Sequence, residues 1–122
     1  MEEKKTTLVL GASENPSRYS YLAIERLLNA GIEVVAVGAK KGNVHQHEIN
    51  DKIPFDREIH TISMYLSAKN QQAYFDDILK LKPKRIIFNP GAENRLLEKT
   101  ATENQIEVLH ACTLVMLSTD TF

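Results

Sequence analysis

A short polar segment near the start of the chain combines a glycine with hydroxyl side chains and a guanidinium group. Its residues with this chemistry are Gly11, Ser13, Ser17, Arg18 and Ser20. A glycine has no Cβ, so it lets a phosphate approach the backbone closely. Serine hydroxyls and the planar guanidinium group of arginine donate hydrogen bonds that phosphate oxygens accept. The segment therefore predicts a loop that binds a phosphate-bearing ligand.

The residues on either side of this segment predict a strand before it and a helix after it. Residues 6–10 are largely apolar and partly β-branched, which is typical of a buried parallel strand. Apolar residues recur with helical spacing over residues 22–28, and Gly31 stands where that helix is expected to end. In such a βαβ unit the first loop lies beyond the carboxyl end of its strand, where backbone N–H groups meet the ligand.

The rest of the chain alternates between expected strands and expected helices. Further strands are predicted at residues 33–37, 59–66, 85–88 and 107–109. Strands separated by helical segments of about a dozen residues indicate an α/β fold with three layers, in which helices cover both faces of a parallel sheet. We expect a Rossmann-like, doubly wound sheet of about five strands in the order 3-2-1-4-5, because right-handed crossovers leave few topologies.

This topology determines where the loops meet. In the expected order the ligand crevice lies between the first and fourth strands, and the polar turns that follow the strands cluster around it. The mixed pattern of residues 59–66 favours a position near the sheet edge. Residues 45–55 show no clean period, so we expect an irregular connection there, with one short strand near Ile53.

Length and composition restrict the classes of function. The 122 residues predict a single domain spanning residues 1–122, with 43% hydrophobic and 25% charged residues as in ordinary globular proteins. A formal charge of −1 argues against a broad nucleic-acid surface. The single cysteine, Cys112, fits a reducing compartment, and no apolar run approaches the ~20 residues of a membrane span. Because residues 1–5 also lack the apolar core of a signal peptide, we expect a cytoplasmic protein without nucleic-acid or membrane partners.

The residues after the second expected strand narrow the choice of nucleotide. Neither the G-x-G-x-x-G fingerprint nor a Walker loop occurs in the sequence. NAD-binding sites place an acidic residue at the end of the second strand, where it binds ribose hydroxyls. Here the sequence reads Gly38-Ala39-Lys40-Lys41. Two cations at this position indicate a ribose that bears a phosphate, as in NADP or coenzyme A (CoA).

Several motifs together resemble a known family. The small stand-alone CoA-binding domains, which are similar to the CoA-binding domain of the succinyl-CoA ligase alpha subunit, open with a motif that resembles Gly11-Ala12-Ser13, Asn15-Pro16 and Arg18-Tyr19-Ser20-Tyr21. Residues 40–42 resemble the family's Pro/Gly-Lys-x-Gly region. Residues 89–94 resemble its loop after the fourth strand, and Cys112-Thr113 resembles its C-terminal Cys-polar pair. The resemblance covers nearly the whole chain.

The resemblance implies CoA or acyl-CoA as the ligand and assigns residues to its parts. The diphosphate would be held by Gly11, Ala12, Ser13, Arg18, Tyr19 and Ser20. The adenosine and its 3′-phosphate would lie beside Lys40 and Lys41. The pantetheine side would be lined by Pro90, Gly91, Glu93 and Asn94. The remaining residues expected to contact the cofactor are Asn15, Pro16 and Gly38.

No catalytic site and no metal site are expected. His45, His47 and His60 lack a carboxylate or cysteine set at metal-binding spacing, and the sequence ties no acid or base to Cys112. The ligase's phosphorylated histidine belongs to a second domain, so the resemblance implies binding without ligase chemistry. We therefore expect a non-catalytic module that binds or senses CoA. The alternatives are an NADP-binding domain of a reductase and a regulatory partner subunit with a vestigial pocket, while self-association or a protein partner stays open.

Overall fold

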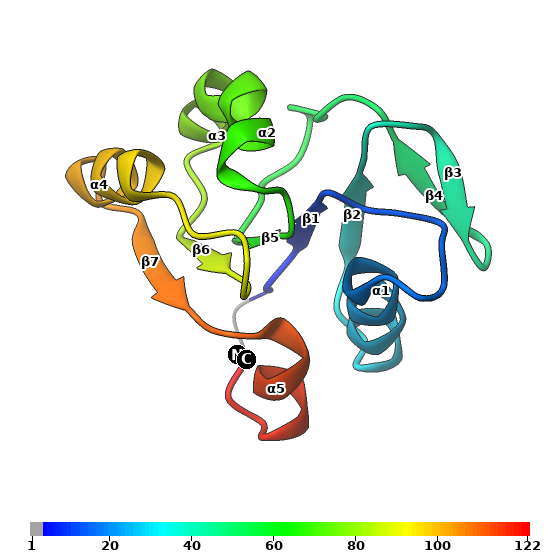
Figure 1. Cartoon of the computed structure of the whole chain (residues 1–122). Coiled ribbons are helices and arrows are strands. Elements are labelled where there is room, and N and C mark those ends of the chain that lie inside the picture. Colours follow the sequence, from blue (N-terminus) through cyan, green and yellow to red (C-terminus); the bar gives the residue numbers. More distant parts are fainter. Residues whose placement is uncertain (1–3) are drawn as a thin grey trace.

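A seven-stranded sheet forms the middle layer of the structure, a computed structural model that describes residues 4–122 (Figure 1). The strand order is β3-β4-β2-β1-β5-β6-β7. The strands are β1 (Thr7–Leu10), β2 (Val34–Val37), β3 (Gly42–Val44), β4 (His47–Asn50), β5 (Thr61–Met64), β6 (Arg85–Phe88) and β7 (Glu107–His110). All pairings are parallel except that between β3 and β4, which form an antiparallel hairpin.

Helices cover both faces of this sheet, which confirms the expected three-layer α/β architecture. The helices are α1 (Tyr19–Asn29), α2 (Ala68–Gln71), the 3-10 helix η1 (Gln72–Tyr74), α3 (Phe75–Leu81), α4 (Arg95–Glu103) and α5 (Thr113–Ser118). Figure 1 shows α2, α3 and α4 above the sheet and α1 and α5 below it. Every α-helix except α1 and α4 is shorter than eight residues, so packing against the sheet rather than intrinsic helix stability holds these segments.

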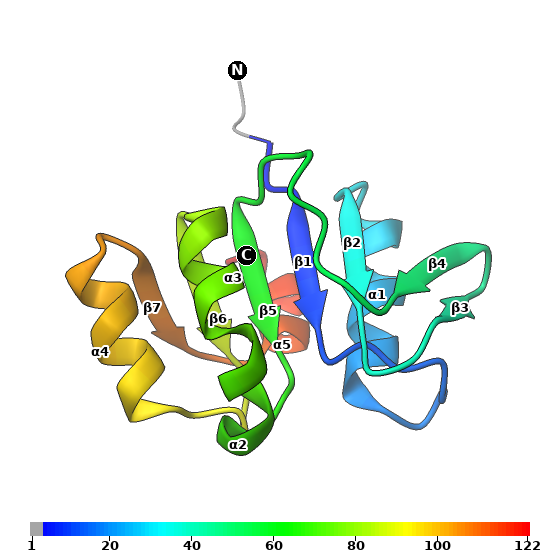
Figure 2. The same cartoon turned by 90° about the horizontal axis from the view of Figure 1, so that it is seen from above.

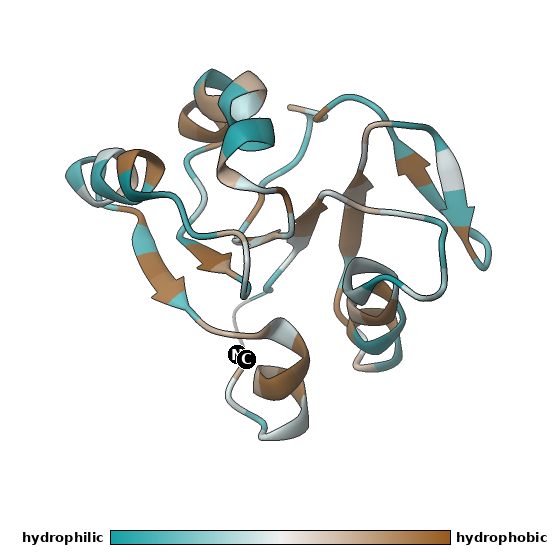
Figure 3. Cartoon of the chain, viewed as in Figure 1, coloured by the Kyte–Doolittle hydropathy of each residue, from teal (hydrophilic) through white to brown (hydrophobic). Residues whose placement is uncertain are grey.

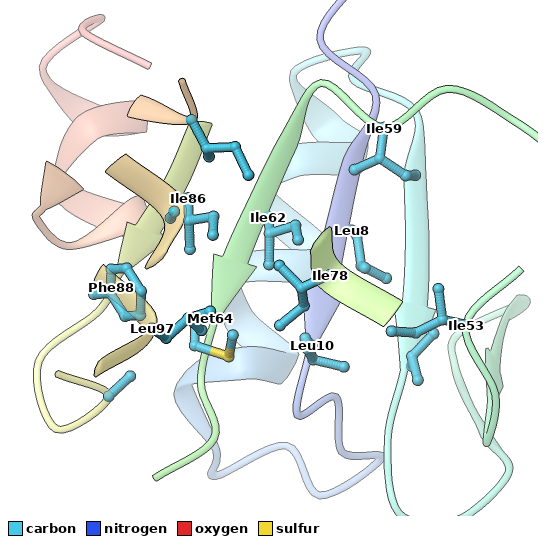
Figure 4. Packing of buried hydrophobic residues seen from close by; sticks show 14 of the residues in the cluster. Leu8, Leu10, Ile53, Ile59, Ile62, Met64, Ile78, Ile86, Phe88 and Leu97 are labelled. Carbon is cyan, nitrogen blue, oxygen red and sulfur yellow. The ribbon is translucent and has the colours of Figure 1, made fainter. Parts of the chain in front are cut away.

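The two faces of the sheet form separate hydrophobic clusters. Alternate residues of a strand point to opposite faces, so Leu8 joins the cluster under α3 and α4 whereas Val9 joins the cluster under α1. Both residues are fully buried. Figure 4 shows the first cluster, with Leu8, Ile62 and Ile78 among its labelled side chains. In Figure 3 the strands β1, β2 and β6 are strongly hydrophobic, as expected for strands covered on both faces.

The expected number and order of strands are wrong. The error in the order comes from the position of β5. This strand, expected near the edge, instead pairs with both β1 and β6, and all of its residues are buried. Its polar residues Thr61 and Ser63 gave the mixed pattern. They are satisfied inside the protein, because Thr61 accepts a hydrogen bond from Arg85 Nε at 2.8 Å and Ser63 bonds to Thr113 at 2.7 Å.

The segment expected to be irregular, residues 45–55, contains β4 and the turn that joins it to β3 in an antiparallel hairpin. Its turn passes through His45, which adopts a left-handed backbone conformation (φ 55°). Only one residue of each strand is fully buried, Val44 in β3 and Ile49 in β4, so the alternation is too short to stand out in the sequence. The strand expected near Ile53 is absent from the described chain, and Ile53 packs into the core from a loop.

The central position of β5 leads to a stability prediction. Ile62→Ala removes a fully buried side chain between β1 and β6, so we expect it to lower the free energy of unfolding by about 2–5 kcal/mol. Urea unfolding followed by circular dichroism measures this loss. Leu96→Ala, at a position that is 63% exposed, is the control and should change stability by less than about 0.5 kcal/mol. A loss below about 1 kcal/mol for Ile62→Ala would contradict burial in a central strand.

Candidate functional site

The sheet changes its direction of winding beside β1. The chain passes from β1 to β2 on one side and later returns to β5 on the other side of β1, so the loops after β1 and β5 diverge. Figure 2 shows the carboxyl ends of β1, β2 and β5 at the same edge of the sheet. Ligands of open α/β sheets bind at such a switch point. The crevice therefore lies between β1 and β5, and not between the first and fourth expected strands, because the strand at residues 61–64 occupies that place.

A groove of about 790 Å³ occupies this edge. The loop from β1 to α1, the segment from β2 to β3, the loop after β5 and the turn after β6 line it, together with Ile49 of β4 and Asn70 of α2. The predicted cofactor-binding residues that line it are Gly11, Ala12, Ser13, Asn15, Arg18, Tyr19, Ser20, Lys40, Lys41 and Pro90. The sequence motifs at the three predicted turns are thus brought to one place.

Gly11 is required by the backbone itself. Its φ of +98° lies in the region that favours glycine, and a Cβ there would lie 3.1 Å from the backbone nitrogen of Leu66. The N–H groups of Gly11 and Ala12 both donate to the carbonyl oxygen of Val37 at 2.9 Å. Gly11 was expected to leave an open path for a phosphate, and it is also needed for the backbone conformation of this loop. The N–H groups of Gly11 and Ala12 already have an acceptor in Val37.

The rest of this loop is organised by its own side chains. Ser13 Oγ accepts a hydrogen bond from the N–H of Asn15, and Asn15 Oδ1 accepts from both the N–H and the hydroxyl of Ser17 at 3.0 and 2.8 Å. Such bonds are the turn-forming interactions of serine and asparagine. Helix α1 then begins after Arg18 with no side-chain cap and no acidic residue in its first turn. The positive end of its dipole is left to a ligand or solvent.

Five of the predicted cofactor-binding residues do not line the groove. Gly38 is buried directly behind it, where a Cβ would lie 2.2 Å from the carbonyl oxygen of Ala12. The Glu93 carboxylate accepts a hydrogen bond from the N–H of Gly91 at 3.0 Å, and bonds from its own N–H and that of Gly91 hold the pKa of Glu93 below its ordinary value. Asn94 caps α4 by accepting from the N–H of Leu97. The last residue of this set, Pro16, is exposed on the loop.

A buried glutamine joins the loops that follow β5 and β6. Gln71 Nε2 donates to the carbonyl oxygens of Leu66 and Ala92 at 2.8 and 2.6 Å, and Gln71 Oε1 accepts from Asn94 Nδ2 at 2.9 Å. The side chain is completely buried. It therefore links the two loops that carry Leu66 and Pro90, which both line the groove. The sequence around residue 71 does not indicate this role, because Ala92 and Asn94 lie 21 and 23 residues further along the chain.

The sequence analysis missed several groove residues, among them Glu14 in the first loop and Ile49 in β4. Tyr65 and Leu66 line the groove from the loop after β5, and Asn70 lines it from α2. Placing the strand of residues 59–66 at the sheet edge removed its loop from the expected site. A correct assignment of that strand beside β1 would have identified Tyr65 and Leu66, because every strand end next to the switch point contributes a loop to the ligand site.

A buried polar network lies beneath the groove on the α5 side. Asn89 Nδ2 donates to Ser63 Oγ at 3.1 Å and Asn89 Oδ1 accepts from the N–H of Thr113 at 2.8 Å, which fixes the start of α5 against the sheet. The hydroxyl of Tyr65 is buried without a hydrogen-bond partner among residues 4–122, and burial raises the pKa of Tyr65 to about 12. Cys112 precedes α5, is half-buried and does not line the groove.

The histidines of the described chain are dispersed rather than clustered. His45 pairs with Glu25 at 2.5 Å and His110 pairs with Glu98 at 2.6 Å, on different parts of the surface. Residues 4–122 contain no group of three side chains able to hold a metal ion. Within the same residues, no helix has the length and hydropathy needed to cross a membrane.

Comparison with protein families gives a match over most of the chain. A family model described as "CoA binding domain" matches residues 5–118. No curated protein is significantly similar to the chain in sequence.

Solved structures share the fold. A crystal structure of a protein described as uncharacterized has 47% sequence identity and a TM-score of 0.94, over 99% of this chain and all of its own. The Thermus thermophilus protein cell-free ID.343 has 22% identity and a TM-score of 0.82, with 98% of this chain and 91% of that chain covered. The dinucleotide forming acetyl-coenzyme A synthetase 1 of Ca. Korarchaeum cryptofilum, in complex with phosphate and ADP, has 19% identity and a TM-score of 0.71, covering 88% of this chain and 25% of its own length.

The glutamine link between the two loops predicts a large effect of a single substitution. Gln71→Leu keeps the volume similar but leaves two carbonyl oxygens and the Asn94 amide without partners, so we expect a loss of about 2–4 kcal/mol in the free energy of unfolding. Urea unfolding measures it. Gln72→Leu, the same change at the exposed neighbouring residue, should be nearly neutral. Equal stability of the two variants would show that the buried bonds contribute nothing.

The buried tyrosine predicts a loss of stability at alkaline pH. Because its pKa is about 12 in the folded protein and about 10 in an unfolded chain, the unfolded state releases its proton first and is favoured as the pH rises above 10. Tyr65 should therefore reduce the free energy of unfolding by about 1 kcal/mol between pH 8 and pH 11. Tyr65→Phe should lack this part of the loss, whereas Tyr19→Phe, at a position that is 71% exposed, should retain it. The same pH dependence in Tyr65→Phe and the wild type would refute the assignment.

Proposed function

The chain belongs to the CoA-binding domain family, and from this premise we propose that it binds CoA or an acyl-CoA in the groove between the ends of β1 and β5. The observation that supports this site is the collection of complementary groups in one groove. The open N-terminus of α1, Arg18 and the lysines at positions 40 and 41 supply positive charge, while Leu66 and Pro90 supply apolar surface. A ligand with phosphates at one end and a largely uncharged chain at the other matches this distribution.

The diphosphate would bind along the loop that leads into α1. Since the N–H groups of Gly11 and Ala12 donate to Val37, the donors that remain for phosphate oxygens are side-chain hydroxyls, the Arg18 guanidinium and the first N–H groups of the helix. Backbone N–H groups at a helix N-terminus and the helix dipole both favour an anion there. A cation such as Arg18 is unfavourable at this end of a helix unless an anion neutralises it.

The adenosine 3′-phosphate would bind beside Lys40 and Lys41. Both side chains are exposed in the groove wall, and neither ammonium group forms an ion pair within residues 4–122. They stand where an NAD-binding protein has an acidic residue, so a phosphorylated ribose suits this end of the groove. NADP shares that feature with CoA and is the second candidate, for the same reason.

The pantetheine arm would extend along the wall that Gln71 holds together. Leu66 and Pro90 line the groove here, next to the polar side chain of Asn70. The predicted contacts of Gly91, Glu93 and Asn94 with the ligand stay a prediction. Their hydrogen bonds within the turn support a contribution to its shape.

The proposed role is binding without catalysis. Among the described residues that line the groove there is neither a histidine nor a cysteine, so the common pairing of a nucleophile with a base is missing at the proposed ligand. We propose residues 1–122 as a single cytoplasmic CoA-binding domain that senses or presents its ligand, alone or with a protein partner. A regulatory subunit with a vestigial pocket is the outcome expected if no nucleotide binds.

Calorimetric titration with CoA, dephospho-CoA and NADP tests the ligand and the lysines together. The wild type should bind CoA more tightly than NADP. In the double variant Lys40→Ala/Lys41→Ala, the affinity for CoA should fall about ten- to thirty-fold, because a hydrogen bond to a charged group contributes roughly 1.5–3 kcal/mol and exposure reduces it. Dephospho-CoA, which lacks the 3′-phosphate, should lose less than about threefold.

Lys52→Ala/Lys99→Ala is the matched control, since it removes two exposed positive charges away from the groove. It should leave both affinities unchanged apart from screening effects. Equal losses for CoA and dephospho-CoA in the first variant would assign the lysines to general electrostatics. Tighter binding of NADP would favour the reductase alternative, and no binding of any nucleotide would favour the vestigial pocket.

A further inference from the structure

The loop after β1 places a carboxylate inside the proposed nucleotide groove. Glu14 lines the groove together with Lys40 and Lys41 from the opposite segment. Its side chain lies against Gly42, the first residue of β3, where a Cβ would lie 2.7 Å from Glu14 Oε2 and 3.1 Å from Glu14 Cδ. Glu14 therefore bridges two segments that are far apart in the sequence and that both face the ligand site.

The lack of a side chain at position 42 is what admits this contact. Gly42 does not adopt a positive φ, so its backbone conformation is open to other residues. A Cβ would nevertheless displace the Glu14 carboxylate from its present position. The pairing of Glu14 with Gly42 is thus a steric fit between a carboxylate and a bare stretch of backbone, directly after Lys41.

A carboxylate is unexpected in a groove whose other charged side chains are cations. Within residues 4–122 no ion pair involves Glu14, although Lys40, Lys41 and Arg18 line the same groove. An ionised carboxylate accepts hydrogen bonds and donates none. It disfavours a phosphate at its own position and favours a hydroxyl or amino group of the ligand there.

We propose that Glu14 reads the ribose of the bound nucleotide by accepting a hydrogen bond from its free hydroxyl. This inference rests on the proposed function. A ribose 3′-phosphate presents an anion and a hydroxyl on adjacent carbon atoms. The groove presents cations at Lys40 and Lys41 and an acceptor at Glu14 beside Gly42, so the two arrangements match. Glu14 is in this view a specificity residue supplied by the first loop, and not by the end of β2 where dinucleotide-binding folds place their acidic residue.

Two fragments of the ligand isolate this hydrogen bond. Adenosine 3′,5′-bisphosphate contains the 2′-hydroxyl, and 2′-deoxyadenosine 3′,5′-bisphosphate lacks it, while both retain the phosphates. The wild type should bind the first about tenfold more tightly, as expected for one charge-assisted hydrogen bond at a partly exposed site. Glu14→Ala should lose this preference by weakening the ribonucleotide alone, and Gly42→Ala should reduce it by displacing the carboxylate. Calorimetry or displacement of a fluorescent nucleotide gives the affinities.

Glu103→Ala, at an exposed position on the last turn of α4, is the control for the change in net charge and should keep the preference. A higher affinity of Glu14→Ala for both bisphosphates would overturn the inference, because the carboxylate would then only repel phosphate. An unchanged preference in Glu14→Ala would overturn it as well, while CoA binding by the wild type would leave the proposed function standing. Failure of the wild type to bind CoA or either fragment would instead refute the proposed function and this inference with it.

Discussion

The carbonyl oxygen of Val37 accepts hydrogen bonds from two successive N–H groups, those of Gly11 and Ala12, and the shape of the groove depends on this contact. It holds the ends of β1 and β2 together at the point where both strands release their loops. Gly38 follows Val37 and lies so close to the Ala12 carbonyl that no side chain fits between them. The two polar segments that leave this junction therefore lie beside each other, with the Glu14 carboxylate of one against Gly42 of the other, directly after the two lysines.

The opposite wall is held by side chains instead of a strand junction. Gln71 bonds to the loops after β5 and β6, and Asn89 bonds to Ser63 and to the start of α5. Each of these polar groups is buried, where an unmade hydrogen bond is more costly than a made one is stabilising. The wall is for that reason specified by a few long-range bonds, while the hydrophobic clusters on the two faces of the sheet supply most of the stability.

The sequence was sufficient for those features that depend on local pattern. The first βα unit and the layered architecture follow from hydrophobic periodicity and from glycine positions, and these predictions were confirmed. The central position of β5 could not be predicted in the same way, because the polar residues Thr61 and Ser63 suggest a solvent-exposed strand. Their hydrogen-bond partners, Arg85 and Thr113, come close to them only in the folded structure. The hairpin was missed because its turn at His45 contains no glycine to mark it. The ligand assignments of individual residues stay predictions.

The bonds of Gln71 also bear on the order in which the protein acquires its site during synthesis. The segments after β1 and β2 emerge early from the ribosome, but Gln71 cannot link the loop after β5 to the loop after β6 until Ala92 and Asn94 have been added. The support from Thr113 beneath that loop comes later still. A nascent chain that ends before these residues has the groove wall formed by the segments after β1 and β2 but lacks the bonds that hold the opposite wall. The two walls of the groove are therefore completed at different points of synthesis, and a ligand that contacts both walls can stabilise the fold only after Asn94 and Thr113 have been added.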